Sequence, residues 1–272
     1  MAGIMRTIRG VMGLWALAGA LTALVAQGPP EPIGKAPALL PGEGLVVAFL
    51  DGSVRAQGDT IRESPMGGLA RLVWMKLEGS TWSSSGRQFR CTGQAGTRVC
   101  TVAKGHGRVN VGKALAEGCE LAFLDWIPQA LARWEVDYGE GMAQQRLEEA
   151  FLPFLGRRKP PTAIPPAAIG SWIGEGDLLR TSPAQLLAWL LEPERSEVLT
   201  LARRFLSGFF VEFRDLLGKE SWWFLPIQVP GVPEGATWVV AGHGQTLAVY
   251  RRTGPQPLQE GLARFKALLD AK

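Results

Sequence analysis

The sequence contains few of the residues that most often bind metals or act as nucleophiles, with three cysteines and two histidines among 272 residues. It has no Cys-x-x-Cys pair, and His106 and His243 are isolated, each between two glycines, where a turn residue is expected. Zinc sites in proteins are usually built from such residues at close spacing. The sequence therefore predicts neither a metal site nor a cofactor.

The chain also lacks a large excess of either charge. It has 29 Lys and Arg against 25 Asp and Glu, for a formal net charge of +4, and no basic stripe alternates with aromatic residues. Binding to nucleic acid is therefore not predicted. The hydrophobic content of 46% excludes a largely disordered chain and is sufficient for a sizeable core.

The N-terminal segment contains no acidic residue. Arg6 and Arg9 precede sixteen uncharged residues at 11–26, and a polar, proline-rich stretch follows at 27–43. This pattern predicts a signal peptide in residues 1–26, with an uncleaved membrane anchor through residues 8–26 as the alternative. The stretch 27–43 is expected to be a linker. We therefore expect an exported, periplasmic or otherwise extracytoplasmic protein, held at the inner membrane if the segment is an anchor.

Export changes the interpretation of the cysteines. Cys91 and Cys100 are nine positions apart, with Gly93 and Gly96 between them. In an oxidising compartment, this spacing favours a disulfide that closes a small loop. Cys119 would remain as a buried thiol inside an apolar helix.

Apolar periodicity predicts the order of the elements. A hairpin is expected at 44–57, a terminal helix closes the chain, and three strands are expected between 220 and 252. Helices are expected between these parts at 67–78, 109–134, 142–156, 181–192 and 194–218. Neither the hairpin nor the three strands would be stable alone. The sequence therefore predicts one α+β domain at 44–272, with an antiparallel sheet built from both ends of the chain and an inserted all-helical subdomain.

Two segments carry a resemblance to a known family. The segment CTVAKGHGRVNVGKALAEGCELAF (100–123) resembles the middle of the transpeptidase domain of penicillin-binding proteins, where Gly-His-Gly and Ala-Leu-x-x-Ser-Cys-Asn-x-x-Phe occur at matching spacings. The segment IGEGDLLRTSPAQLLAWL (173–190) is similar to that family's Ile-Gly-Gln-Gly…Thr-Pro-x-Gln-Leu segment. The resemblance covers roughly residues 44–270 and implies the fold that this family shares with the serine β-lactamases.

The resemblance also implies a chemistry to look for. In this family, a Ser-x-x-Lys motif opens the central helix, where the serine attacks a peptide carbonyl and the lysine takes its proton. A Ser-x-Asn loop and a Lys-(Ser/Thr)-Gly strand at the sheet edge complete the site. The substrate implied is the D-Ala-D-Ala stem of peptidoglycan, or a β-lactam.

The positions that match these motifs have lost most of that chemistry. Gly68 stands at the position of the nucleophile and Arg71 at that of the basic lysine. Glycine has no attacking atom, and a guanidinium does not accept a proton at neutral pH. Gly118 and Glu120 stand for the serine and asparagine of the second motif. Only Lys219, in the third motif, keeps the family's residue and would be a substrate-binding side chain.

Ser64 is the alternative nucleophile. With Ser64 as the attacking residue, Gly67 would occupy the lysine position and the base would still be missing, so a helix N-cap is the simpler role for Ser64. The function predicted is a non-catalytic domain that binds peptidoglycan stem peptides or a cell-wall synthesis protein. The alternatives are an active serine D,D-transpeptidase, carboxypeptidase or β-lactam-binding enzyme that uses Ser64, and a secreted structural domain with only topological similarity to the family.

Overall fold

The computed structural model describes residues 38–155, 168–192, 196–207, 222–229, 235–254 and 258–269. Leu39–Lys266 forms one compact unit. The expected signal or anchor at 1–26 lies outside the described residues, as does Lys219. Among the described helices, none combines the length and the apolar character that a membrane crossing requires.

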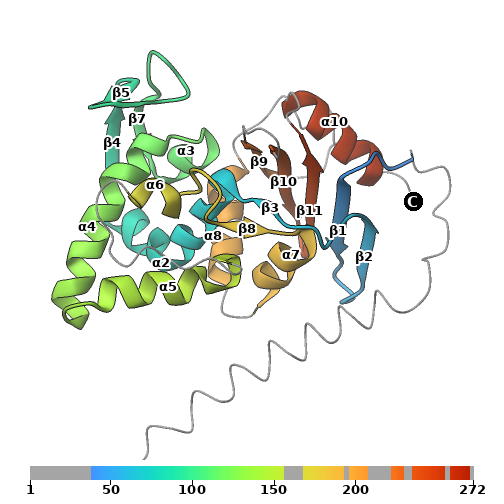
Figure 1. Ribbon diagram of the computed structural model, residues 1–272, viewed down its shortest axis with the longest axis horizontal. Coiled ribbons are helices and arrows are strands. Elements are labelled where there is room, and N and C mark those ends of the chain that lie inside the picture. Colours follow the sequence, from blue (N-terminus) through green and yellow to red (C-terminus); the bar gives the residue numbers. More distant parts are fainter. Residues whose placement is uncertain are drawn as a thin grey trace, which may run out of the picture. The chain divides into compact units, whose positions relative to one another are not determined.

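A five-stranded antiparallel sheet joins the two ends of the domain, as predicted (Figure 1). The strand order is β2-β1-β11-β10-β9, so the hairpin near the N-terminus pairs with the last strand. Val46 lies opposite Val249, which in turn lies opposite Val240, and all three are fully buried. The strands are β1 (Glu43–Ala48), β2 (Val54–Gly58), β9 (Trp223–Val229), β10 (Ala236–His243) and β11 (Thr246–Thr253).

The helices lie mainly between β2 and β9 in the sequence, which confirms the inserted helical subdomain. They are η1 (Gly67–Leu69), α2 (Ala70–Ser84), α3 (Val111–Ala116), α4 (Glu120–Tyr138), α5 (Met142–Leu155), α6 (Ile169–Trp172), α7 (Pro183–Leu191) and α8 (Ser196–Leu206), with α10 (Leu258–Leu269) after the sheet. Short strand pairs connect them: β3 (Ser64–Pro65) with β8 (Arg180–Thr181), β4 (Gln88–Cys91) with β7 (Gly107–Asn110), and β5 (Gln94–Ala95) with β6 (Arg98–Val99).

Two of the predicted helices differ from the structure. The single helix expected at 109–134 is divided into α3 and α4, because Gly118 between them has a φ of +67°, which an α-helix does not allow. The helix expected at 194–218 begins at Ser196 and is described as far as Leu206. By contrast, α7 begins as predicted, with Ser182 and Gln185 forming a capping box.

Tryptophans fix the central helix α2 within the helical subdomain. The ring of Trp74 stacks on those of Trp82 and Trp134, with centroids 6.3 and 6.0 Å apart. Its indole Nε1 also donates a hydrogen bond of 2.9 Å to the carbonyl of Trp172 in α6. These contacts join α2 to α4 and α6, and they therefore set the position of the residues at the start of α2.

A buried carboxylate stabilises the other side of the domain. Glu43 in β1 is 1% exposed and accepts hydrogen bonds from Arg264 Nη2 at 2.8 Å, Tyr250 Oη at 2.9 Å and the Leu40 backbone N–H at 2.7 Å. Burial raises the pKa of Glu43, but the hydrogen bonds from Arg264, Leu40 and Tyr250 outweigh it, so the pKa lies below its ordinary value of 4.5. A depressed pKa means that the ionised form stabilises the fold.

We predict that the stabilisation from Glu43 is fully present above the ordinary carboxyl pKa and is lost as the pH falls through the lower pKa of the folded state. Glu43→Gln should decrease the free energy of unfolding at pH 7 by about 3 kcal/mol, because it leaves Arg264 without its buried counter-ion. It should also flatten the acid side of the stability profile, measured by urea unfolding from pH 7 to pH 3. Glu260→Gln, at an exposed position of α10, is the control and should leave both unchanged. An acid slope that is the same in Glu43→Gln and the wild type would contradict this assignment.

Candidate functional site

The turn before α2 is held from two sides. The Met66 backbone N–H donates to the carbonyl of Leu179 at 3.0 Å, and the indole of Trp238 in β10 donates to the carbonyl of Pro65 at 2.9 Å. Gly67 has a φ of +53°, which permits the chain to turn directly from β3 into η1. These contacts place the next residues beside the sheet edge, where the family resemblance expects a nucleophile.

The loop between α3 and α4 carries the second matched motif. Gly118 turns the chain, Cys119 is the N-cap of α4, and Glu120 is the first residue of that helix. An acidic side chain in the first turn interacts favourably with the positive end of the helix. This turn therefore presents a carboxylate toward the start of α2.

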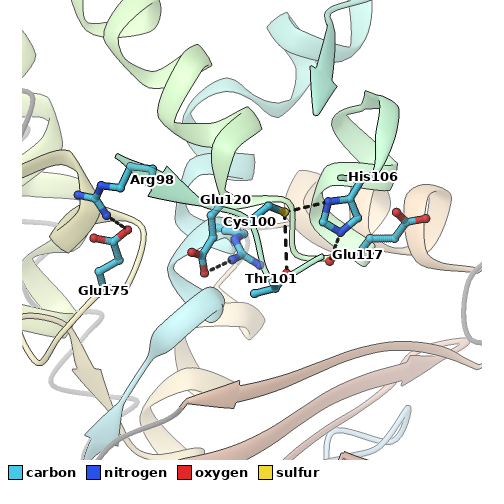
Figure 2. Close-up of polar contacts among 8 residues, drawn as sticks. Arg98, Cys100, Thr101, His106, Glu117, Glu120 and Glu175 are labelled. Atoms are coloured by element: carbon cyan, nitrogen blue, oxygen red, sulfur yellow. Dashed lines mark hydrogen bonds and ion pairs between the residues drawn. The ribbon is translucent and has the colours of Figure 1, made fainter. Parts of the chain in front are cut away.

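The Arg71 side chain joins these two turns. Arg71 is 3% exposed, and its Nη2 lies 3.1 Å from Oε1 of Glu120. Its guanidinium also lies over the ring of Phe123, 5.6 Å from the centroid. In Figure 2, a dashed line marks the ion pair that the Glu120 carboxylate makes with Arg71, and Arg98 is paired with Glu175 nearby. The predicted positions of the lysine and asparagine are thus brought into direct contact.

The guanidinium also occupies the space beside both motif glycines. A β-carbon at Gly68 would lie 2.8 Å from Nη1 of Arg71, and one at Gly118 would lie 3.2 Å from the same atom. Both distances are shorter than ordinary van der Waals contact. Side chains at the nucleophile position and at the second-motif position would therefore collide with the Arg71 guanidinium.

The buried guanidinium of Arg71 has a counter-ion, but not all of its N–H groups are hydrogen-bonded within the described residues. Burial lowers the pKa of Arg71, and the Glu120 carboxylate opposes that shift. The Nε atom of Arg71 is buried and has no hydrogen-bond partner within the described part of the chain. An arginine remains protonated even so. Arg71 therefore cannot take the proton of an attacking hydroxyl, and Glu120 acts as its counter-ion.

The sheet edge next to this turn is apolar. A β-carbon at Gly68 would lie 3.0 Å from Cδ1 of Ile227, and one at Gly67 would contact Val229, both in β9. The sheet-edge motif was predicted upstream, at Lys219, which is outside the described residues. Ile227 and Val229 were not predicted to line the turn, although the apolar run at 222–229 indicated a buried strand.

The matched segment at 173–190 packs against the turn before α2 and is hydrogen-bonded to it. Gly174 packs directly on the backbone of Gly67, so closely that a β-carbon at Gly174 would overlap the Gly67 carbonyl oxygen. The match to the family at this position follows from close backbone packing.

Ser64 does not have the role of a helix cap. It lies in β3 opposite Thr181, and η1 and α2 begin after Met66 and Leu69, neither of which makes a side-chain capping bond. Ser64 is 2% exposed, and its hydroxyl accepts a hydrogen bond of 2.9 Å from Nη1 of the fully buried Arg251. Ser64 is therefore a buried structural partner of Arg251, without a base of its own.

The cysteines are arranged differently from the prediction. All three are free, so the predicted disulfide between Cys91 and Cys100 is not formed, and Cys119 caps α4 instead of lying inside a longer helix. The thiols of Cys91, Cys100 and Cys119 and the ring of His106, which no sequence pattern groups, come together, with one ligand atom of each within 4.8 Å of the others. The Gly-His-Gly turn that made His106 look isolated brings it to the cysteines.

The thiols of this group have different acidities. Burial raises the pKa of Cys91, but hydrogen bonding outweighs it, chiefly from the backbone N–H of His106, and the pKa falls to about 6. Burial raises the pKa of Cys119 to about 12. In the absence of a bound ion, Cys91 is thus more readily ionised than Cys119.

Comparison with known proteins shows the fold. No protein-family model matches the sequence, and no curated protein matches it. Among solved structures, PBP2 from Pseudomonas aeruginosa is similar with a TM-score of 0.58 at 11% identity, over 94% of this chain and 76% of that one. A class D β-lactamase from Nostoc has a TM-score of 0.51 at 13% identity, over 84% and 91%.

The penicillin-binding protein PBP2 of Helicobacter pylori, solved as a complex with MreC, has a TM-score of 0.58 at 10% identity. The match covers 84% of this chain and 59% of that one, so this chain spans about three fifths of that protein. These likenesses show that the chain has the fold of penicillin-binding proteins and β-lactamases, as the sequence predicted.

We predict that Gly68 and Arg71 are energetically coupled. Gly68→Ala should destabilise the protein by about 1–3 kcal/mol, because the new methyl group collides with the guanidinium. In an Arg71→Met background, the same substitution should cost less, since the shorter, flexible thioether can move aside. Denaturant unfolding of the two single variants and the double variant gives the coupling energy. Equal costs of Gly68→Ala in both backgrounds would show that the guanidinium does not fill this space.

Proposed function

We propose that this chain is an exported, non-catalytic domain of the penicillin-binding-protein type that acts in cell-wall assembly by binding. The observation that carries the proposal is the position of the Arg71 guanidinium, which fills the space beside Gly68 and Gly118 and is paired with Glu120. The site that would perform acyl transfer in a relative with a Ser-x-x-Lys motif is here a packed ion pair.

Each step of acyl transfer lacks a group in this arrangement. Attack on a carbonyl requires an oxygen or sulfur nucleophile with a base close to it. Gly68 offers no side-chain atom, and Arg71 holds its proton. The hydroxyl of Ser64 is buried and engaged with Arg251, a cation that does not accept a proton either.

We favour a protein partner over a stem peptide, because this site is poorly suited to the peptide. A stem peptide ends in a carboxylate, which needs an accessible cation or hydrogen-bond donor, whereas the Arg71 side chain is 4% exposed and the neighbouring strand offers Ile227. The PBP2 of H. pylori was solved in a complex with MreC. By analogy, we propose a cell-wall synthesis protein as the partner, bound on a surface outside the old cleft.

Export rests on the N-terminal segment. Its two arginines, sixteen uncharged residues and proline-rich continuation support a signal or anchor in residues 1–26. With such a segment, the domain would be located in the periplasm or on the outer side of the inner membrane, where the cell wall is assembled.

We predict that a fluorescent penicillin does not label the purified protein covalently, as judged by in-gel fluorescence after denaturation. Ser64→Ala should be equally unlabelled, since Ser64 takes no part in chemistry. An active penicillin-binding protein in the same gel shows that the probe works. Labelling of the wild type that disappears in Ser64→Ala would instead establish the alternative, an acylating enzyme with Ser64 as its nucleophile.

Calorimetric titration with a stem peptide ending in D-Ala-D-Ala tests the binding role. We expect no measurable heat of binding, because the Arg71 guanidinium is buried and already paired with Glu120. Saturable binding that is weakened by Arg71→Met would assign the domain to stem-peptide recognition and would refute the preference for a protein partner.

A further inference from the structure

Three cysteines and one histidine converge from the ends of four elements of the helical subdomain. Cys91 ends β4, Cys100 follows β6, His106 precedes β7 and Cys119 caps α4; these four residues are named the Cys3His cluster below. One ligand atom of each lies within 4.8 Å of the others, and the three cysteines are 2%, 5% and 0% exposed. Figure 2 shows Cys100 and His106 of this cluster facing each other.

The dimensions of the cluster match a tetrahedral zinc site. With Zn–S bonds of about 2.3 Å and Zn–N bonds of about 2.0 Å, the ligand atoms of a tetrahedron lie roughly 3.5–3.8 Å from one another. All four ligand atoms lie within 4.8 Å of one another, at most about 1 Å beyond this range, and Cys100 Sγ is 3.2 Å from His106 Nδ1, slightly closer than in a tetrahedron. Small side-chain rotations would therefore suffice to bring all four to one ion.

The histidine is held in the orientation that a metal ligand needs. Its Nε2 lies 3.2 Å from the backbone carbonyl oxygen of Glu117 and donates its proton there. Nδ1 is then the unprotonated nitrogen, and it points toward the thiols. A ligand histidine whose other nitrogen donates to a carbonyl is the usual arrangement around protein-bound metals.

Backbone amides are also directed at the sulfurs. The N–H groups of Gly93 and His106 donate to the sulfur of Cys91, and that of Ala122 donates to the sulfur of Cys119. Such donors stabilise the thiolates that a metal requires.

The segment between Cys91 and Val109 has little else to stabilise it. Its residues are mostly exposed, and its strands β5 and β6 have only two residues each. A loop that buries so little apolar surface normally needs a cross-link or a bound metal to keep one conformation. The predicted disulfide would have supplied that cross-link, but three free thiols and a histidine are present instead.

We propose that the Cys3His cluster binds one Zn²⁺ as a structural site that fixes the turn carrying Gly118 and Glu120. Three thiolates and one imidazole favour zinc among the common divalent ions, and four protein ligands leave no open position for catalysis. On binding, the ion displaces the remaining thiol protons into solvent, and no group is oxidised or reduced.

The location of Cys119 connects this site to the ion pair in the old active site. Cys119 lies between Gly118, which packs against Arg71, and Glu120, which binds it. A zinc ion on Cys119 would therefore hold the carboxylate in place as the counter-ion of the buried guanidinium. This proposal does not depend on the absence of catalysis, because a structural zinc is compatible with either function.

The test is the metal content of the full chain, purified under reducing conditions with a tag that binds no metal. We expect one zinc per chain by mass spectrometry of the metal. After replacement by Co²⁺, we expect the thiolate-to-cobalt charge-transfer bands and strong visible absorption of a tetrahedral site. Removal of the metal with a chelator should lower the melting temperature by more than about 5 °C, and added Zn²⁺ should restore it.

The two histidines provide a matched pair of variants. His106→Gln should lose the zinc, whereas His243→Gln, in the hairpin between β10 and β11, should retain it. If His106→Gln fails to fold, the zinc content and cobalt spectrum of the wild type remain decisive. A wild-type protein without metal that gives no tetrahedral cobalt spectrum would overturn the proposal, as would a disulfide between any two of the three cysteines in freshly purified protein.

Discussion

The ion pair between the buried Arg71 guanidinium and Glu120 is the interaction on which the arrangement of the site depends. Because a guanidinium is large and always charged, its burial requires both space and a counter-ion. Gly68 and Gly118 leave the space free, and Glu120 supplies the charge. The four positions matched to the family's motifs thus form one consistent set around Arg71.

The scaffold around this pair is held by packing. The central helix α2 contacts stacked indoles, and the turn before it is hydrogen-bonded to the sheet and to the residue before β8. Position 174 requires glycine because the backbone of Gly67 lies against it. These constraints act on the fold whether or not a nucleophile is present, and the fold is shared with solved structures at 10–13% identity.

The sequence was sufficient to predict the features that depend on local patterns. The hairpin, the sheet built from both ends and the cap at Ser182 each follow from periodicity or from turn residues. Features that arise from tertiary contacts were not predictable in this way. His106 meets cysteines on other elements, and Ser64 is buried against Arg251, so both features join residues that are distant in the sequence. The helix break at Gly118 was also missed, because the apolar pattern continues on both sides of it.

The shared use of one volume by Arg71 and the two glycines means that these positions cannot be changed independently. A serine at position 68 would meet the guanidinium first, and a lysine at position 71 alone would have no hydroxyl at position 68 to deprotonate. A Ser-x-x-Lys motif at 68–71 would therefore require both substitutions together. For protein engineering, Gly68 and Arg71 form one two-residue unit.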